Sequence, residues 1–178
     1  MSQIIEEVLA HFKQRGHLEY GESVTQLNHA LQTAALAVHE GAADALVTAA
    51  LLHDSGHLLH DEGTAERGHD AQHKEAGANF LAAYFVDTAV EPGRLQVQAK
   101  RYLCTTDKRY LATLSPASLQ SLALQGGPFS AEEVAAFEKN PHFRAALHLR
   151  RWDDQGKVAD LDILPIDHYI PYLRASLQ

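Results

Sequence analysis

The sequence predicts an all-α fold, built as a single compact domain over residues 1–178. Apolar residues recur at helical spacing along most of the chain, with short breaks between the periodic segments. No segment shows apolar and polar residues alternating strongly enough to indicate a strand. Hydrophobic residues make up 46 % of the chain and aromatic residues only 7 %, so alanine and leucine supply much of the apolar content. A chain of this length can bury a substantial core.

Three helices are expected in the first third of the chain. Residues 4–14 form the first, because their apolar side chains share one side of a helix. Residues 16–21 are expected to form a loop. Ser23 is a suitable N-cap for the second helix, which ends at Gly41. Residues 42–53 are almost entirely apolar and form the third helix.

A long irregular loop is expected at residues 56–72, which are mostly Asp, Glu, Gly, His and Thr. Helices should follow, and serines mark two of their starts: Ser115 precedes a proline, and Ser130 begins a capping box with Glu133. The expected helices lie at about residues 74–84, 92–104, 115–124, 131–139, 141–152 and 167–176.

Composition and charge exclude several classes of protein. The formal net charge is −8, and binding to phosphate backbones normally needs a cationic face, so a general nucleic-acid binder is disfavoured. No stretch reaches the roughly 20 continuous apolar residues that cross a bilayer. A single cysteine, Cys104, cannot form an internal disulfide. We therefore expect a cytoplasmic protein with a small-molecule partner and no membrane or nucleic-acid partner.

The adjacent residues His53 and Asp54 are the strongest functional signal. They end the apolar segment 42–53, where a carboxylate is costly to bury unless a cation pairs with it. A metal ion would be such a partner. His29 lies near an apolar helix face, and His73 opens a second periodic segment, so three helices are expected to direct imidazoles to one point.

Any one of the 12 histidines, taken alone, is more simply explained as a solvated or hydrogen-bonded residue. The combination of three such segments in this order is much harder to attribute to chance. Imidazoles and carboxylates without thiolates suit iron, manganese or zinc. The sequence therefore predicts a metal centre of one of these ions.

The order of His29, the His53-Asp54 pair and a later aspartate resembles the HD-domain superfamily of helical metalloproteins. The match narrows to the HD oxygenases of phosphonate degradation and covers about residues 16–167. The segments that carry it are 26–29, 50–57, 72–74, 99–103, 125–128 and 150–153. This resemblance implies an HD-domain fold and a mixed-valent Fe(II)/Fe(III) di-iron site that uses O2 to cleave a carbon–phosphorus bond.

The substrate class also follows from the resemblance. Known members act on 1-hydroxy-2-aminoethylphosphonate, which gives glycine and phosphate, or on its trimethylammonium analogue, which gives glycine betaine and phosphate. The partners implied for this chain are therefore a small hydroxyphosphonate and O2. Whether the nitrogen of the substrate is primary or trimethylated stays open.

The resemblance also implies a ligand set, in which Asp54 bridges two irons. The implied ligands are His29, His53, Asp54, His73 and Asp153. The family has a sixth ligand, a histidine, at the position of Gln96, and an amide is a weaker ligand than an imidazole. Three explanations are open for Gln96: an altered variant with an impaired second metal site, a natural homologue that has diverged in chemistry, or an engineered His-to-Gln change.

Two cationic side chains and one histidine are expected near the substrate. Lys100 should neutralise phosphonate oxygens as a compact charge, and Arg150 offers a planar fork to the same group. His57 is expected to hydrogen-bond the substrate or to orient a metal ligand.

Five further residues complete the predicted site. Ser118, Ser121 and Gln125 lie at i, i+3 and i+7, so one helix face would present three hydrogen-bonding groups; an ordinary exposed face is an equally good explanation for the two serines. Tyr20 and Glu22 stand where the family has a lid tyrosine and a glutamate that contacts the nitrogen of the substrate. Glu22 suits an ammonium group, whereas a quaternary ammonium favours aromatic faces.

Three functions are consistent with the sequence. The first is an iron-dependent oxygenase that cleaves a 1-hydroxyphosphonate. The second is a metal-dependent phosphohydrolase, in which a metal-bound hydroxide attacks a phosphoester; Gln96 favours it slightly, because hydrolysis tolerates a single ion. The third is a metal-binding or phosphonate-binding protein without turnover.

Overall fold

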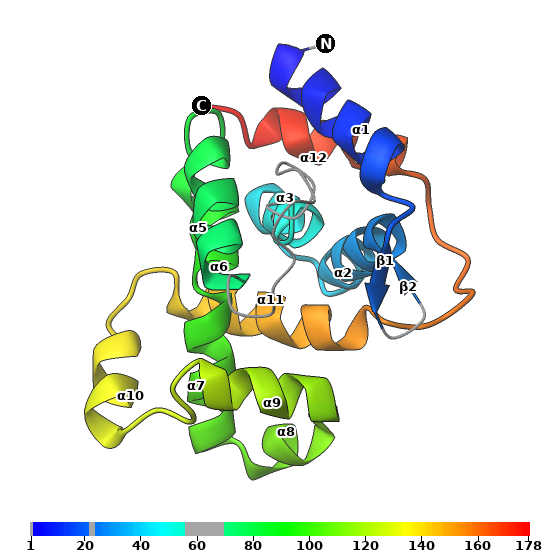
Figure 1. The fold of residues 1–178 in the computed structure, drawn as a ribbon. Coiled ribbons are helices and arrows are strands. Elements are labelled where there is room, and N and C mark those ends of the chain that lie inside the picture. Colours follow the sequence, from blue (N-terminus) through cyan, green and yellow to red (C-terminus); the bar gives the residue numbers. More distant parts are fainter. Residues whose placement is uncertain (1, 22–23, 56–69) are drawn as a thin grey trace.

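The computed structural model describes residues 2–21, 24–55 and 70–178, and at positions 20, 21, 70–74 and 76 it describes the backbone alone. Helices dominate, which confirms the all-α prediction (Figure 1). The helices are α1 (Gln3–Arg15), α2 (Gln26–His39), α3 (Asp44–Leu52), α5 (Asp70–Leu81), α6 (Asp87–Arg94), α7 (Gln96–Thr106), α8 (Lys108–Thr113), α9 (Pro116–Leu124), α10 (Ala131–Phe137), α11 (Phe143–Gln155) and α12 (Ile170–Ala175), preceded by the 3₁₀ turn η2 (Ile166–Tyr169). Within the described chain, none of these helices is both long and apolar enough to cross a membrane.

Helix α3 occupies the centre of the larger hydrophobic core. Val47, Ala50 and Leu51 are almost completely buried, because α2, α6, α11 and α12 all pack against this helix. Figure 1 shows α3 nearly end-on, with these helices around it. Alanines on α2 and α3 let the two helices approach closely, and the ends of α2, α3 and α11 can therefore reach one another.

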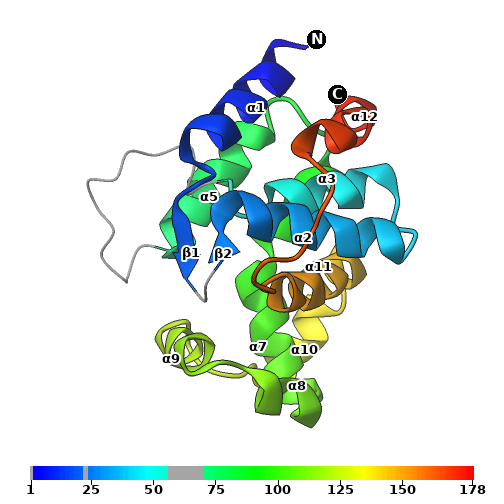
Figure 2. The same cartoon turned by 90° about the vertical axis from the view of Figure 1, so that its right-hand side faces the viewer.

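Helices α7 to α10 form a smaller group at the end away from the N-terminus (Figure 2). One apolar cluster contains Phe129 and Phe137, and the ring of Phe137 lies 5.2 Å from that of Phe143. A second cluster contains Leu103, Tyr110 and others. Both clusters include residues of α7, so they hold this helix beside α11.

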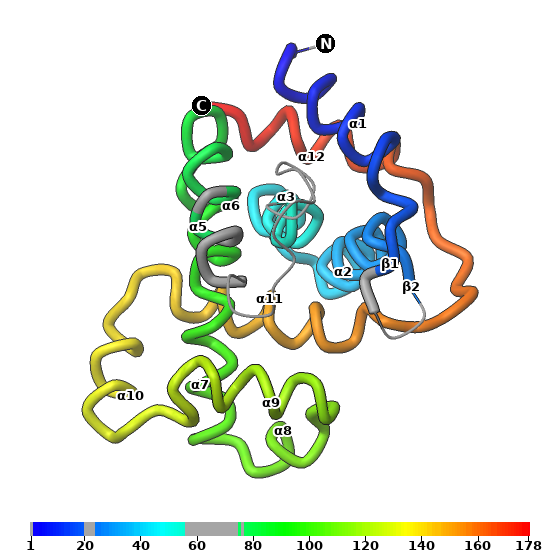
Figure 3. The backbone as a smooth tube through the Cα atoms, viewed as in Figure 1, coloured from blue at the N-terminus to red at the C-terminus, as the bar shows by residue number. Residues whose placement is uncertain are grey.

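The chain after α11 follows an extended path outside α2 before it reaches α12 (Figure 3). The amide of Gln32 holds this segment, because its Nε2 donates to the carbonyl of Val158 at 2.8 Å and its Oε1 accepts from the amide of Val158 at 2.9 Å. Gly156, at the start of the segment, lies directly against α2, where an added Cβ would come within 2.7 Å of Thr33 Oγ1.

Several expected elements differ from the structure. Two short antiparallel strands were not predicted: β1 (Glu19–Gly21) lies where a loop was expected, and β2 (Val24–Thr25) lies where the second helix was expected to begin. Such short strands leave no alternation pattern to detect. The N-cap of α2 is Thr25 rather than Ser23, because Thr25 Oγ1 accepts from the amide of Asn28 at 3.2 Å. Most of the loop predicted at residues 56–72 lies outside the described residues.

The segment predicted as one helix, residues 92–104, is two. Helix α6 already contains Pro92, the chain bends at Leu95, and α7 begins at Gln96. Helix α8 was not predicted, although Asp107 caps it by accepting from the amide of Tyr110 at 3.2 Å. The predicted segment 141–152 forms α11, which extends three residues further, and this extension contains Asp153.

Candidate metal centre

Three helices bring four metal-binding side chains together. His29 lies in the first half of α2, His53 and Asp54 follow the end of α3, and Asp153 lies near the end of α11. All four residues are buried, with exposed fractions between 1 % and 8 %. One donor atom from each residue falls within 4.8 Å of all the others, which is the spacing of ligands around one ion.

The distances place the two imidazoles at the centre of this group. His29 Nε2 and His53 Nε2 are 3.1 Å apart. The nearest carboxylate oxygens are Asp153 Oδ1, 3.2 Å from His29 Nε2, and Asp54 Oδ2, 3.3 Å from His53 Nε2. The four donor atoms therefore face a common point.

Backbone carbonyls orient both imidazoles. His29 Nδ1 lies 2.8 Å from the carbonyl oxygen of Gly156, and His53 Nδ1 lies 2.8 Å from that of Ala50. A carbonyl oxygen can only accept, so each Nδ1 must carry the proton and each Nε2 of a neutral ring presents a lone pair. Metal-binding histidines are typically fixed in this way. Two lone pairs at 3.1 Å repel each other unless a cation lies between them.

The electrostatics of the site also favour a cation. Burial alone would lower the pKa of His53, but the carboxylates of Asp54 and Asp153 outweigh it and raise this pKa to about 10. For Asp153, burial opposes ionisation, yet the Arg150 guanidinium and the two imidazoles hold its pKa well below the usual value. The carboxylates are thus anionic, and the imidazole between them is driven to carry positive charge unless another cation supplies it.

The donor set fits a metal ion. Asp153 Oδ1 is buried and has no hydrogen-bond partner within the described part of the chain, and it lies 3.2 Å from His29 Nε2. A bound cation would satisfy this oxygen and both Nε2 atoms. Two imidazoles and two carboxylates, without a thiolate, suit iron, manganese or zinc.

The structure places Lys100 and Ser121 together. Lys100 is 5 % exposed on α7, and its Nζ donates to Ser121 Oγ of α9 at 2.8 Å. Ser121 Oγ in turn donates to the carbonyl oxygen of Ser118 at 3.0 Å. Gln125 ends the same helix, and its Oε1 is buried without a hydrogen-bond partner among the described residues. The predicted face of α9 therefore meets Lys100 through Ser121.

Arg150 is engaged by two carboxylates of its own helix. Its Nη1 pairs with Asp153 Oδ2 at 2.9 Å, its Nε donates to Asp154 Oδ2 at 3.0 Å, and its Nη2 pairs with Asp154 Oδ1. These contacts use one N–H on each nitrogen, and a guanidinium has five N–H groups. Within the described part of the chain, one N–H on each terminal nitrogen is therefore left for another acceptor.

Gln96 is the first residue of α7 and has no exposed surface. Its Nε2 donates to the carbonyl oxygen of Pro92 at 3.1 Å, and its Oε1 is buried without a hydrogen-bond partner in the described chain. The amide is therefore anchored one turn back and keeps an unused oxygen.

Four predicted site residues fall outside what the structure describes. Glu22 and His57 lie outside the described residues. Tyr20 belongs to β1 and His73 to α5, and only their backbone is described. The roles expected for these four side chains remain predictions.

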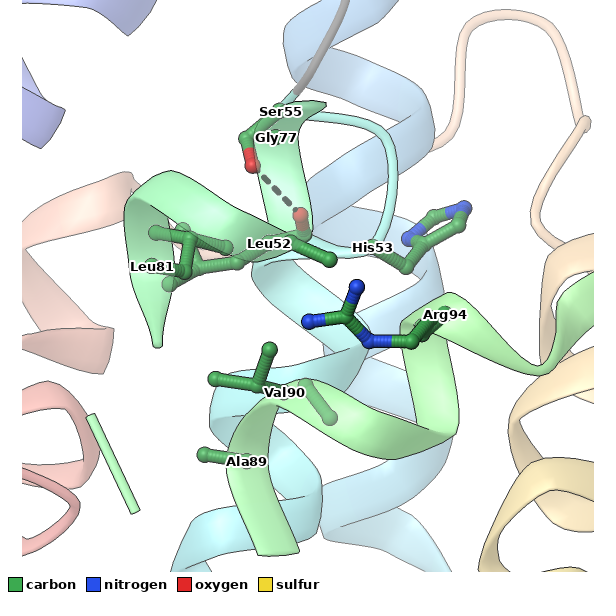
Figure 4. Close-up of a pocket in the computed structure, with 11 residues that line it drawn as sticks. Leu52, His53, Ser55, Gly77, Leu81, Ala89, Val90 and Arg94 are labelled. Carbon is green, nitrogen blue, oxygen red and sulfur yellow. Dashed lines mark hydrogen bonds between the residues drawn. The ribbon is translucent and has the colours of Figure 1, made fainter. Parts of the chain in front are cut away.

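A small cavity is present behind His53. It lies between α3, α5 and α6, has a volume of about 10 Å³ and is lined by Leu52, His53, Val90 and Arg94, among others (Figure 4). Such a volume holds about one water molecule. This cavity is therefore too small for anything larger than a water molecule.

Sequence reasoning missed three residues beside the site. Asp154 was detectable, because it lies four residues after Arg150 and such pairs meet on a helix surface. Tyr110, which donates to Asp154 Oδ2 at 2.7 Å, comes from the helix α8 that was not predicted. Gly156 contributes only its carbonyl oxygen, and a backbone group leaves no signal in the sequence.

Comparisons with known proteins agree with this geometry. Residues 26–110 match the family model described as the HD domain, a range that includes His29, His53, Asp54 and Lys100. The chain is 41 % identical over 174 residues to the [1-hydroxy-2-(trimethylamino)ethyl]phosphonate dioxygenase (glycine-betaine-forming) of Leisingera caerulea, covering 96 % of this chain and 89 % of that protein. This chain belongs to the HD-domain phosphonate dioxygenases.

A second relative in this family has a different named substrate. The hydroxymethylphosphonate dioxygenase of Gimesia maris is 45 % identical over 166 residues, covering 92 % of this chain and 83 % of that protein. The substrates named for these two relatives share a hydroxyphosphonate group and differ in the substituent on the hydroxyl-bearing carbon. The matches extend well beyond the HD model and across most of the chain.

Proposed function

We propose that this protein is an iron-dependent oxygenase that cleaves the carbon–phosphorus bond of a 1-hydroxyalkylphosphonate with O2 and releases phosphate. The observation that carries the proposal is the convergence of His29, His53, Asp54 and Asp153 in a chain whose named relatives are phosphonate dioxygenases. These four side chains would hold iron. His73 and Gln96 are the ligands proposed for the second iron.

Iron, when bound, would supply O2 activation and a positive charge for the hydroxyl and phosphonate oxygens of the substrate. The protein would supply the binding of the phosphonate. Lys100 is buried, so its charge would act on a phosphonate more strongly than an exposed lysine does. Ser121 holds the Lys100 ammonium in position, and the two remaining N–H groups of Arg150 would be available to the same oxygens.

The atom balance of the reaction is testable. One O2 added to hydroxymethylphosphonate gives formate and phosphate, and one O2 added to the trimethylammonium substrate gives glycine betaine and phosphate. In both cases one oxygen atom enters the carboxylate and one enters the phosphate. O2 consumed and phosphate released should therefore be equal in amount.

The substituent on the hydroxyl-bearing carbon is the least determined part of the proposal. The name of one relative specifies a substrate with a trimethylamino group, and the name of the other specifies hydroxymethylphosphonate, which has no such substituent. A primary ammonium would suit Glu22, and a trimethylammonium group would need aromatic faces, for which Tyr20 is the candidate. We also propose a cytoplasmic enzyme, because the single cysteine, Cys104, is free and buried.

The decisive experiment uses the full chain loaded anaerobically with ferrous iron. O2 uptake and phosphate release are measured with hydroxymethylphosphonate, 1-hydroxy-2-aminoethylphosphonate and its trimethylammonium analogue, and ethylphosphonate, which lacks the hydroxyl, serves as the control. Equal O2 and phosphate from one hydroxylated compound, and none from ethylphosphonate, supports the oxygenase. EPR and Mössbauer spectra with and without that substrate would identify a mixed-valent pair.

One observation favours a second candidate function, that of a metal-dependent phosphohydrolase. Gln96 stands at the position where the family has a histidine ligand, and a site with one ion would suit hydrolysis. Phosphate release from phosphomonoesters or nucleotides without O2 would support a phosphohydrolase. Binding of a hydroxyphosphonate with no product under either condition would support a protein without turnover.

A further inference from the structure

Three side chains, those of Arg150, Asp154 and Tyr110, link the metal centre to α8. Tyr110 donates its hydroxyl proton to Asp154 Oδ2 at 2.7 Å, Asp154 pairs with Arg150, and Arg150 pairs with Asp153. Tyr110 and Asp154 also line an open cavity of about 480 Å³ on the outside of the protein. The first residue of this chain of contacts is therefore near solvent, and the last is a proposed metal ligand.

Asp154 is held on both of its carboxylate oxygens. Oδ2 accepts from Tyr110 and from Arg150 Nε, while Oδ1 pairs with Arg150 Nη2. Adjacent residues of a helix differ by about 100° around its axis, so Asp154 cannot face the point that Asp153 faces. Both oxygens of Asp154 therefore bind Arg150, although an aspartate side chain is also a suitable metal ligand.

This arrangement decides how Arg150 contacts Asp153. Guanidinium groups favour bidentate pairing with a carboxylate, through two parallel N–H···O contacts. Here Asp154 takes the bidentate contact, through Nε and Nη2. Asp153 receives a single contact, from Nη1 to Oδ2, and its other oxygen, Oδ1, stays directed at the imidazoles.

We propose that Asp154 and Tyr110 are positioning residues that keep Arg150 on one oxygen of Asp153, so that the other oxygen is left for the metal. The inference rests on the proposed metal centre but not on the oxygenase reaction. Without the Asp154 carboxylate, Arg150 is free to turn and pair with both oxygens of Asp153. The metal would then compete with a guanidinium for Oδ1.

The test is iron affinity, measured on the full chain by anaerobic equilibrium dialysis against ferrous iron. Asp154→Asn should weaken iron binding by about 10-fold to 100-fold, the usual effect of losing a partner that orients a metal ligand. Tyr110→Phe removes one hydroxyl and should weaken it in the same direction by a smaller factor. The matched control is Asp107→Asn, which alters a partly exposed carboxylate paired with Arg151 and keeps a side chain able to cap α8.

A double-mutant cycle separates positioning from general structural damage. If Asp154 acts through Arg150, Asp154→Asn should have little further effect on iron affinity in an Arg150→Ala background. Circular dichroism verifies the fold of each variant, and EPR of the iron-loaded protein should change for Asp154→Asn but not for Asp107→Asn.

Two results would overturn the inference. Unchanged iron affinity in Asp154→Asn, with only a raised KM for the phosphonate, would mean that Arg150 serves the substrate and not Asp153. Equal losses in Asp154→Asn and Asp107→Asn would mean that neither acts specifically on the centre. The assay needs no turnover, so it remains valid even if the protein does not catalyse the oxygenase reaction. If the unaltered protein bound no iron, both the metal centre and the positioning role of Asp154 would be overturned.

Discussion

Replacement of Gln96 by histidine should strengthen the binding of the second iron. The Nε2 of Gln96 donates to the carbonyl oxygen of Pro92, and its Oε1 is buried without a partner among the described residues. An imidazole can keep the first bond through Nδ1, as His29 and His53 each do with a backbone carbonyl. Its Nε2 would then replace the amide oxygen, and a neutral imidazole is the stronger ligand for iron.

The expected magnitude follows from metal linkage. At free iron concentrations that leave the second site of the unaltered protein mostly empty, iron per chain should rise toward two, because an imidazole binds iron more tightly than an amide oxygen does. At a free iron concentration 100 times the Kd of the restored site, binding adds about 2.7 kcal/mol to the free energy of unfolding. For a chain of this size that raises Tm by roughly 5–10 °C. Without iron, the stability should change little, since one unpaired buried acceptor replaces another.

The chain offers a matched control on the same helix. Gln98 also has a buried Oε1 without a partner in the described chain, and it lies about 200° around the helix axis from Gln96. Iron content is measured by inductively coupled plasma mass spectrometry and Tm by differential scanning fluorimetry, with and without iron. The reasoning would be refuted if Gln96→His bound no more iron than Gln98→His.

Four other substitutions test separate parts of the site and the fold. Asp54→Ala should abolish iron binding, whereas Lys100→Ala should keep the iron and weaken phosphonate binding. The measurements are iron content and a phosphonate titration on both variants. Equal iron content in the two variants would contradict the roles of Asp54 as a metal ligand and Lys100 as a phosphonate-binding residue. Gly156→Ala should lower the free energy of unfolding by about 1–3 kcal/mol in urea denaturation, because the added methyl group would overlap a buried hydroxyl group on α2. The hydrogen bond from Arg151 lowers the pKa of Asp107 in the folded protein. The ionised carboxylate therefore stabilises the fold at pH values above its unfolded-state pKa. This contribution is lost as the pH falls through the lower, folded-state pKa. The stability difference between Asp107→Asn and the unaltered protein should therefore shrink as the pH falls below about 4, near the unfolded-state value, and a difference that grows there would contradict the assignment.

Much of the centre was accessible from residue identity and order. His29 and the His53-Asp54 pair lie beside strongly apolar segments, and the cost of burying a charged pair without a cation predicts that a metal site joins them. The structure brings these residues together with Asp153. The helix that carries Asp153 was expected to end at Trp152, one residue before Asp153, and in the structure it extends to Gln155.

Other parts of the site had no sequence signal. The hairpin of β1 and β2 is too short to show alternation. Pro92 and Gly93, which would ordinarily indicate a break, lie inside α6, and the break between α6 and α7 comes at Leu95. The carbonyl of Gly156 that orients His29 lies 127 residues away in the chain. Contacts of this kind depend on how helices pack and not on which side chains they carry.

The sequence by itself determined the helical class, the type of metal donors and the helices that bear them, because periodicity and residue chemistry are local properties. The family resemblance had already implied Asp153 as a ligand. Only the tertiary structure decided that Asp154 turns to Arg150, that both histidines present Nε2, and that Arg150 is shared between two carboxylates. These choices depend on the rotation of each helix about its axis and on the packing of α2, α3 and α11. Rotation and packing arise from the burial of the whole core, which no local pattern specifies.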